Sequence, residues 1–398
     1  YKIGDLGLAK VMDTSKASTT NIGTPYYMAP ELIDGNFDAK SDVWSVGIIL
    51  YQMLTGTYPF QKEDNMNFKV CVRCITYNHS KYIVDAMNGF VKQQTNFPYV
   101  CCIIDDASPD GEQEIITQYV SDNFIVNSES HYLKKDVGDA LVSYVQHTLN
   151  KNCFFVVVLL KENYYQQGKG TMPFIKDWCD ASEYYALCEG DDYWISPDKL
   201  QKQIDILDTN PNCTLTYHAS KVIYDDEYET AIHNTDRFSD VKEQYSFKDV
   251  VLSYPFQTAS VVYRKHITEC EIYQRACETK FTLSKMLFIA AADCGEVLGF
   301  NETMSVYRKH TGGMSDMIET GENATRKINT YHYISLILPY WKKKCINQYL
   351  SGRIWDAYIM TPYPDFYTTK LIIKTLYATP LIALRLLLRQ VRYILKRK

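Results

Sequence analysis

From residue 68 onward, the chain alternates short, continuously apolar runs with stretches that are apolar only at every third or fourth position. Continuous runs predict buried strands, and the wider spacing predicts helices with one apolar face. The predicted strands are residues 68–76, 99–104, 154–160 and 184–188. The predicted helices are residues 83–91, 112–120 and 138–149. Apolar strands separated by helices indicate a mostly parallel sheet covered on both faces, which is an α/β fold.

Three of these strands end in polar side chains. The groups that follow them are Thr76, Tyr77 and Asn78, then Asp105 and Asp106, and finally Glu189, Asp191 and Asp192. In parallel sheets, ligands bind beyond the carboxyl ends of the strands, where such groups converge. Clustered carboxylates are costly to bury unless a cation neutralises them, and oxygen ligands suit Mg²⁺ or Mn²⁺. The alternative for residues 189–198 is a solvated turn in which Asp198 caps the next helix.

The composition is that of an ordinary globular protein: 398 residues, 46% hydrophobic and 22% charged, with a net charge of −5. This length allows two or three domains, and the mild acidity argues against a nucleic-acid partner. The chain begins within an apolar-periodic segment, so we expect a fragment or an incomplete gene product. Cys71 and Cys74 form a CxxC without a second pair, so no zinc site is expected. Most of the 12 cysteines are expected to be core residues in a reducing compartment.

The first 60 residues carry a different signature. It consists of Asp5-Leu6-Gly7, Gly23-Thr24-Pro25, Ala29-Pro30-Glu31 and the helical run 41–47. In order and spacing these motifs resemble the C-terminal lobe of a eukaryotic-type protein kinase. The resemblance implies that Asp5 holds Mg²⁺, that Thr19 or Thr20 is an activation-loop phosphosite, and that Asp42 anchors the catalytic loop. Thr24 and Glu31 are further positions of the kinase-like motifs.

The other parts of a kinase site are not found in this sequence. A Gly-rich loop, its partner lysine and a catalytic loop do not occur, so we predict an inactive remnant with a marginal fold. Polar residues 61–65 end the kinase pattern, and a new apolar segment opens at Met66. The predicted domains are therefore 1–65, 66–315 and 316–398, and we expect that two unrelated genes have been joined.

Residues 66–315 resemble the family-2 inverting glycosyltransferases of the GT-A fold. The motifs that carry the resemblance are CITYNH, IIDDASPDG, KENYYQQGKG, ALCEGDDYW, FQTASVVYRK and MSVYRKHTGGMS, in the family's order. The resemblance implies transfer of a sugar from a nucleotide-activated donor, most often a UDP-sugar, to an acceptor hydroxyl. It implies a Rossmann-like, mostly parallel sheet sandwiched by helices.

The resemblance also assigns roles to residues. Thr76, Tyr77 and Asn78 would border the nucleoside, and Asp105 or Asp106 would accept the uracil N–H. Asp191, with Glu189 or Asp192, would bind Mn²⁺ or Mg²⁺ that bridges the diphosphate. Arg308 and His310 would meet the same diphosphate, with a surface hairpin as the alternative. The acceptor side would include Thr258, Ser260 and Trp194, although the first two also fit a polar strand end.

One position departs from the family pattern. The family usually places a Gly-Asp pair here, and its aspartate deprotonates the attacking hydroxyl, but this chain has Leu283-Ser284. A serine is no general base near neutral pH, and losing such a base typically costs about 10²- to 10⁴-fold in rate. Glu278 or Asp293 are alternatives, so the catalytic base stays unassigned.

The last segment is helical and basic in pattern. Residues 370–398 hold eight Lys or Arg and no acid, and no uncharged stretch in them is long enough to span a membrane. This mixture predicts a helix lying on an anionic membrane surface, with packing onto the catalytic domain as the alternative.

These inferences together predict a cytoplasmic, membrane-peripheral glycosyltransferase that acts on a glycan or lipid-linked acceptor. The alternatives are a kinase-derived, ATP-binding signalling protein and a non-catalytic module that binds sugar nucleotides.

Overall fold

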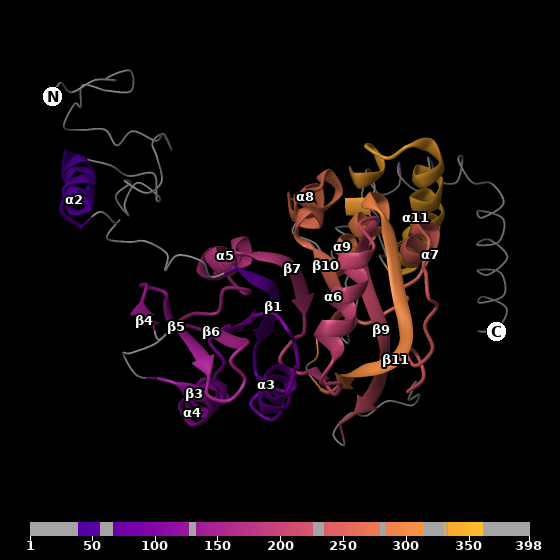
Figure 1. Ribbon diagram of the computed structural model, residues 1–398. Helices are drawn as coiled ribbons and strands as arrows, with labels where there is room; N and C mark the ends of the chain where they lie inside the picture. The colour runs from indigo at the N-terminus through magenta and orange to yellow at the C-terminus, as the bar shows by residue number, and fades with distance from the viewer. Residues whose placement is uncertain are drawn as a thin grey trace. The chain divides into compact units, whose positions relative to one another are not determined.

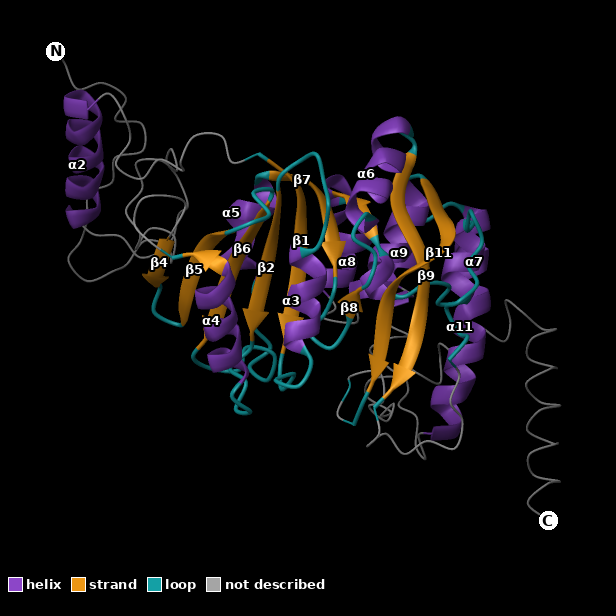
Figure 2. Ribbon diagram, turned by 60° about the horizontal axis from the view of Figure 1, so that its bottom comes forward, coloured by secondary structure: helices purple, strands orange, loops and turns teal. Residues whose placement is uncertain are grey.

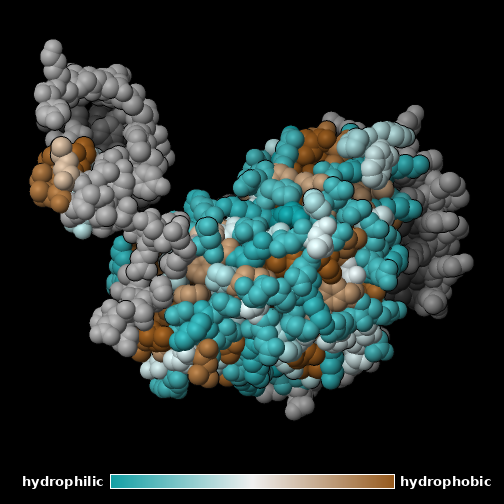
Figure 3. Space-filling model, in the orientation of Figure 1, coloured by the Kyte–Doolittle hydropathy of each residue, from teal (hydrophilic) through white to brown (hydrophobic). Residues whose placement is uncertain are grey.

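The computed structural model describes residues 39–55, 67–126, 133–225, 235–278, 283–311, 313, 330–331 and 333–360. The chain divides into two compact units, Tyr1–Met66 and Asn67–Lys398. In the first unit, helix α2 (Ala39–Thr55) exposes apolar side chains along its length, seen in brown in Figure 3. They include Val43, Val46, Leu50, Met53 and Leu54, which are 56–79% exposed.

The second unit is a mixed α/β structure (Figure 1), as the sequence predicts. Its strands are β1 (Phe68–Thr76), β2 (Tyr99–Asp105), β3 (Phe124–Ile125), β4 (Leu133–Asp136), β5 (Ala140–His147), β6 (Cys153–Leu160), β7 (Ser182–Leu187), β8 (Tyr193–Trp194), β9 (Cys213–Tyr224), β10 (Val262–Arg264) and β11 (Glu296–Lys309). Its helices are α3 (Ile83–Val91), α4 (Glu112–Asn123), α5 (Met172–Asp180), α6 (Lys199–Thr209), α7 (Phe247–Leu252), α8 (Glu271–Glu278), α9 (Leu283–Cys294) and α11 (Tyr340–Met360). Two 3₁₀ turns, η2 (Thr258–Ser260) and η3 (Lys265–Glu269), flank β10.

The strands form one sheet in the order β3-β5-β6-β2-β1-β7-β10-β9-β11-β8, with β4 paired to β5. The central strands β6, β2, β1 and β7 are parallel, which confirms the predicted parallel core. The flanking pairs β5–β6 and β10–β7 are antiparallel. Thr76 at the end of β1 is in register with Asp105 at the end of β2, so these polar strand ends lie side by side. Figure 2 shows β6, β2 and β1 next to one another behind α3 and α4.

The central strands are apolar throughout because both of their faces are covered. Helix α3 is amphipathic at helical spacing, and it packs Ile83, Met87 and Phe90 into the same fully buried core as Val70 and Val72 of β1. Each such side chain contributes about 1.5–3 kcal/mol when it leaves water. The core therefore holds β1 rigidly and fixes where its polar end lies.

The predicted helix at residues 138–149 is wrong, because residues 140–147 form the antiparallel strand β5. Apolar residues at 141, 142, 144 and 145 imitate helical spacing, but burial along β5 follows the strand alternation for most of its length. Valine and tyrosine also favour strands. The predicted strand at 68–76 and helix at 83–91 match β1 and α3 in full.

The second half of the sheet is built on β9 and β11, a long parallel pair that runs from Glu296 to Lys309 on the β11 side. Its end delivers residues 308–310 to the carboxyl edge of β1 and β7. No helix among the described residues is long and apolar enough to cross a membrane. The basic segment 370–398 lies outside the described residues.

Candidate functional site

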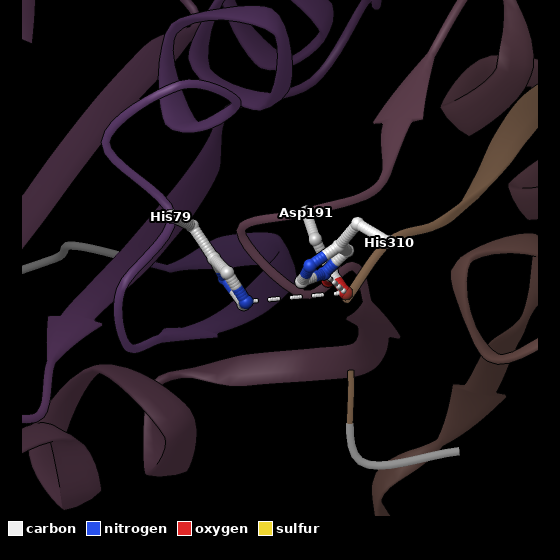
Figure 4. Close-up of side chains that lie close together, drawn as sticks. All are labelled: His79, Asp191 and His310. Carbon is white, nitrogen blue, oxygen red and sulfur yellow. Dashed lines mark hydrogen bonds and ion pairs between the residues drawn. The ribbon is translucent and has the colours of Figure 1, made fainter. Parts of the chain in front are cut away.

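Three side chains with metal-ligating atoms meet beyond the strand ends: His79, Asp191 and His310 (Figure 4). His310 Nε2 lies 3.2 Å from Asp191 Oδ2, and His79 Nε2 lies 4.0 Å from the same oxygen. The three ligand atoms all lie within 4.8 Å of one another. They come from the turn after β1, the turn after β7 and the end of β11, so the sheet topology brings them together.

Each imidazole is oriented through its other ring nitrogen. His310 Nδ1 lies 3.1 Å from the carbonyl oxygen of Thr311, which only accepts, so this Nδ1 carries a proton. His79 Nδ1 lies 3.1 Å from Thr76 Oγ1, and the hydroxyl proton of Thr76 is donated to the carboxylate of Glu112. Thr76 Oγ1 therefore accepts from His79 Nδ1–H. In the neutral form, both Nε2 atoms keep a lone pair that faces the carboxylate between them, as in metal sites whose ligands are set by outer partners.

Glu112, which the sequence pattern does not single out, joins the two turns behind this site. Its carboxylate accepts hydrogen bonds from Thr76 Oγ1, from the backbone N–H of His79 at 2.9 Å and from the hydroxyl of Ser108 at 2.9 Å. The side chain is fully buried, and burial raises its pKa to about 6. Glu112 is the first residue of α4, where an acid looks like ordinary helix N-terminal charge. The sequence alone therefore gave no signal for it.

The electrostatics of the three residues fit a divalent cation. Burial acts to raise the pKa of the Asp191 carboxyl, but the hydrogen bond from His310 and the charges of both imidazoles lower it. The same hydrogen bond raises the pKa of His310, whereas burial lowers the pKa of His79. A metal would take the place of the proton that now mediates the His310–Asp191 contact. One carboxylate oxygen and two imidazole nitrogens suit Mn²⁺ better than Mg²⁺, which prefers oxygen ligands.

The two other predicted metal ligands lie differently. Asp192 is buried, and its carboxylate accepts from the backbone N–H of Arg308 at 2.9 Å and from Gln257 Nε2 at 3.0 Å. Burial raises its pKa well above the usual range. Burial and the charge of Asp191 raise the pKa of Glu189 to about 7. The geometry therefore groups Asp191 with two histidines and not with its acidic neighbours in sequence.

Asp105 and Asp106, the paired acids at the end of β2, differ in whether each carboxylate oxygen accepts a hydrogen bond. Both oxygens of Asp106 accept backbone N–H groups, from Tyr164 at 2.7 Å and from Tyr165 at 3.0 Å. Asp105 Oδ1 accepts from the backbone N–H of Ser108 and from Gln113, but its Oδ2 is buried without a hydrogen-bond partner. Asp106 thus holds a loop, and Asp105 has an acceptor to spare.

The predicted nucleoside-side residues lie on the turn that follows β1. Thr76 is buried, Tyr77 is partly buried, and Asn78 is exposed with a φ of 60°. A positive φ in a tight turn is tolerated by asparagine better than by most residues. The backbone N–H of Asn78 donates to Ser108 Oγ at 3.0 Å, which joins this turn to the one after β2.

Arg308 is buried beside the candidate metal ligands, and its guanidinium already donates to protein atoms. Its Nη1 donates to the backbone oxygen of Asp191 at 3.0 Å, and its Nη2 forms an ion pair with Asp85 at 2.8 Å. The guanidinium also lies over the ring of Tyr82, 4.4 Å from its centroid. Arg308 therefore fixes the turn that carries Asp191 and adds positive charge beside it.

The residues predicted for the acceptor side are largely buried. Trp194 is 3% exposed, its indole N–H donates to the carbonyl of Ala259, and its ring packs in the hydrophobic core. Ser260 is fully buried and donates to the carbonyl of Gln257. Thr258 shares a hydrogen bond of 3.0 Å with the hydroxyl of Tyr254. Of these residues, Trp194 and Ser260 offer no free group to an acceptor.

Ser284 lies near the start of α9, and its hydroxyl accepts a 3.4 Å hydrogen bond from Tyr254. The two acids considered as replacement bases have other partners. Glu278 accepts from the hydroxyl of Tyr333 at 2.9 Å, and Asp293 forms an ion pair with Lys342 at 2.5 Å. Neither is shown in contact with Ser284.

The kinase-like positions Asp5, Thr24 and Glu31 lie outside the described residues. Asp42 belongs to α2, but its side chain is not among those described. Residues 1–120 match the family model of the protein kinase domain, which confirms the resemblance seen in the N-terminal motifs. The match also covers residues of β1, α3 and β2, which the sheet hydrogen bonds tie to β6 and β7.

Among curated proteins, an uncharacterized protein of Mycobacterium tuberculosis (strain ATCC 25618 / H37Rv) is 32% identical over 244 residues. The match covers 60% of this chain and 58% of that protein, so the chain spans less than two thirds of this relative.

Among solved structures, S. aureus TarS 1–349 in complex with UDP-GlcNAc is similar with a TM-score of 0.46 and 16% identity, over 77% of this chain and 79% of that one. The mannosyltransferase PcManGT from Pyrobaculum calidifontis, in complex with GDP-Man and Mn²⁺, has a TM-score of 0.40 and 11% identity, over 84% and 88% of the two chains. Both TM-scores are below 0.5, so the function is argued from the site.

Proposed function

We propose that the second unit is a metal-dependent, inverting glycosyltransferase that moves a sugar from a nucleoside-diphosphate donor, a UDP-sugar by preference, to an acceptor hydroxyl. The observation that carries this proposal is the convergence of His79, Asp191 and His310 within 4.8 Å at the carboxyl edge of the parallel strands. That edge is where α/β sheets bind nucleotides. The glycosyltransferase-like motifs of the sequence surround the same edge.

A divalent ion held by these three residues would neutralise the charge that develops on the departing nucleoside diphosphate. The chain's own groups prepare that position. Thr76 and Thr311 hold the Nδ1 protons of the two imidazoles, so both Nε2 atoms face the site. Arg308 fixes the backbone of Asp191.

The base of the nucleotide is proposed to meet Asp105. Its Oδ2 is a buried acceptor without a donor, and leaving such a group unpaired costs about 1–3 kcal/mol. The imide N–H of uracil is a neutral donor that would satisfy it. Asp106 is left out of this role because both of its oxygens already accept backbone N–H groups.

The acceptor is proposed to be a cell-surface or lipid-linked glycan, with the protein peripheral to an anionic membrane on its cytoplasmic side. Tyr340 and Trp341 at the start of α11 are 84% and 56% exposed, and three lysines follow them directly. Exposed aromatic rings beside lysines are typical of segments that bind a membrane surface.

The proposal is tested by the release of UDP from a panel of UDP-sugars, with and without Mn²⁺, using the full chain. Asp191→Ala removes a metal ligand, and Asp205→Ala, on the exposed side of α6, is the matched control. We expect metal-dependent release that disappears in Asp191→Ala and persists in Asp205→Ala. Release that is unaffected by Asp191→Ala would contradict the assignment.

A second candidate function is a non-catalytic module that binds sugar nucleotides, and Ser284 at the base position favours it. This candidate predicts that UDP-sugars bind but that no UDP is released from them. In that case Ser284→Asp would place a carboxylate beside Tyr254 and start turnover, while Ser284→Asn would not. A kinase-derived function predicts ATP binding instead, which calorimetry with ATP measures.

A further inference from the structure

Arg73 carries a positive charge in the middle of the sheet without an anionic partner. It lies on β1 in register with Leu187 of β7, and its side chain is partly buried. Its Nε is buried and has no hydrogen-bond partner. No ion pair joins its guanidinium to an acid among the described residues. Buried cations are normally paired, so this position needs an explanation.

The groups that face Arg73 are neutral at pH 7. They are the phenols of Tyr263 and Tyr273 and the thiols of Cys71 and Cys179. Tyr263 is fully buried, and its hydroxyl is also without a hydrogen-bond partner. Two unsatisfied polar groups, one cationic and one a hydroxyl donor, thus occupy the same face of the sheet.

Other arginines of this chain are treated differently by the fold. Arg264 donates to the carbonyls of Cys213 and Leu207, among others. Arg308 has both a carbonyl partner and an acid partner. The missing partner of Arg73 is therefore specific to its position.

The position of Arg73 on β1 indicates which ligand would reach it. Arg73 and Ile75 lie on one face of β1, because side chains two residues apart in a strand point to the same side. Ile75 is 41% exposed, so this face opens toward the strand ends. The turn that carries Asp191 is bonded to β1 at this point, because the backbone N–H of Cys188 donates to the carbonyl oxygen of Arg73 and that of Gly190 to the carbonyl oxygen of Ile75, both at 3.2 Å. Arg73 therefore lies beside the turn that carries Asp191, with α8 and β10 contributing the two tyrosines.

We propose that Arg73 and Tyr263 form an oxyanion subsite for the acceptor, and that the acceptor bears a phosphate or carboxylate group. This inference rests on the proposed glycosyltransferase function, which it extends by naming the acceptor class. A guanidinium binds either anion through two parallel N–H groups, and the phenol supplies a further donor. The subsite holds the acceptor by its charge while a hydroxyl of the same molecule faces the donor sugar.

The test measures binding by the full chain, with glucose 6-phosphate and glucuronate as anionic probes and glucose as the neutral probe. Calorimetry without donor and with EDTA keeps metal-mediated binding out of the result. We expect each anionic sugar that fits to bind about tenfold or more tightly than glucose. Arg73→Met abolishes the difference, Arg73→Lys retains part of it, and Arg275→Met leaves it intact. Arg275 is a matched control because it is paired with Glu271 on the same helix that carries Tyr273.

Tyr263→Phe guards against a folding defect in Arg73→Met, because it removes a single hydroxyl and leaves the ring and the guanidinium in place. It is expected to weaken binding of the anionic probes about three- to tenfold. A preference for phosphate over carboxylate, or the reverse, identifies the acceptor group. Equal binding of charged and neutral sugars, or a preference that survives both Arg73→Met and Tyr263→Phe, would overturn the inference. UDP release by the unaltered chain decides the proposed function separately, so failure of one is distinguishable from failure of the other.

Discussion

Glu112→Gln is expected to weaken metal binding although Glu112 contacts no metal-ligating nitrogen or oxygen directly. In the unaltered chain, Thr76 donates its proton to Glu112 and accepts one from His79 Nδ1, which leaves His79 Nε2 free to bind a cation. In the glutamine variant, the side-chain oxygen still accepts from the backbone N–H of His79 and from the hydroxyl of Ser108. The amide NH₂ group therefore faces Thr76. Thr76 must then accept from the amide and donate to His79 Nδ1.

That reversal moves the proton of His79 to Nε2, which then cannot ligate. A hydrogen bond to a charged group contributes about 1.5–3 kcal/mol, and the hydrogen bond that replaces it in the variant about 0.5–1.5 kcal/mol. The preference for the ligating tautomer therefore falls by about 1–2 kcal/mol, which is about 5- to 30-fold in metal affinity. Mutations of such outer partners typically cost about 10- to 100-fold, which agrees.

The assay is titration of Mn²⁺ into the metal-free chain, followed by calorimetry at pH 7.5 or by the loss of the free Mn²⁺ resonance signal. Glu114→Gln is the matched control, because Glu114 is an exposed acid in the same first turn of α4. The melting temperature of both variants is measured first, so that a local folding defect is recognised. If Glu112→Gln binds Mn²⁺ as tightly as Glu114→Gln, the proposed tautomer control is refuted.

Three further predictions follow from single contacts. Gly190→Ala brings a Cβ to 2.0 Å from a threonine hydroxyl and should destabilise by about 1–3 kcal/mol in urea, whereas Gly170→Ala has open space and should not. The thiol of Cys270 has its pKa lowered to about 7 by a hydrogen bond from Cys294, so its alkylation rate should rise between pH 6 and 8 and then level off. Trp341→Ser should lower binding to anionic vesicles about fivefold, with neutral vesicles as the control.

The central sheet could be predicted from the sequence because its strands are buried on both faces. Such strands are continuously apolar, and β2 is buried at all seven positions. The strand β5 resembles a helix in sequence because its apolar residues at 141, 142, 144 and 145 fit helical spacing as well as strand alternation. The spacing of apolar residues then does not distinguish a strand from a helix. Pairing with β6 along residues 140–146 makes this segment a strand.

The candidate site was predicted in part. The sequence predicts Asp191 as a metal ligand because acids that follow a buried strand are conspicuous, and it predicts His310 through its motif as a diphosphate contact. His79 lies in the motif CITYNH, yet its role depends on where β11 ends in space. Glu112 could not be found at all. Residues that come from different strands share no spacing in the sequence, so only the register of the sheet shows which of them meet.

Two polar groups without a hydrogen-bond partner lie on the neighbouring strands β1 and β2. Asp105 Oδ2 on β2 is an acceptor without a donor, and Arg73 Nε on β1 is a donor without an acceptor. An apolar pair of similar shape would have been as stable as a buried polar pair, or more so, and an unpaired group costs more than either. A sheet that needed only stability would therefore hold neither group. We propose that the acid accepts from a donor on the nucleotide and that the arginine binds an anion on the acceptor.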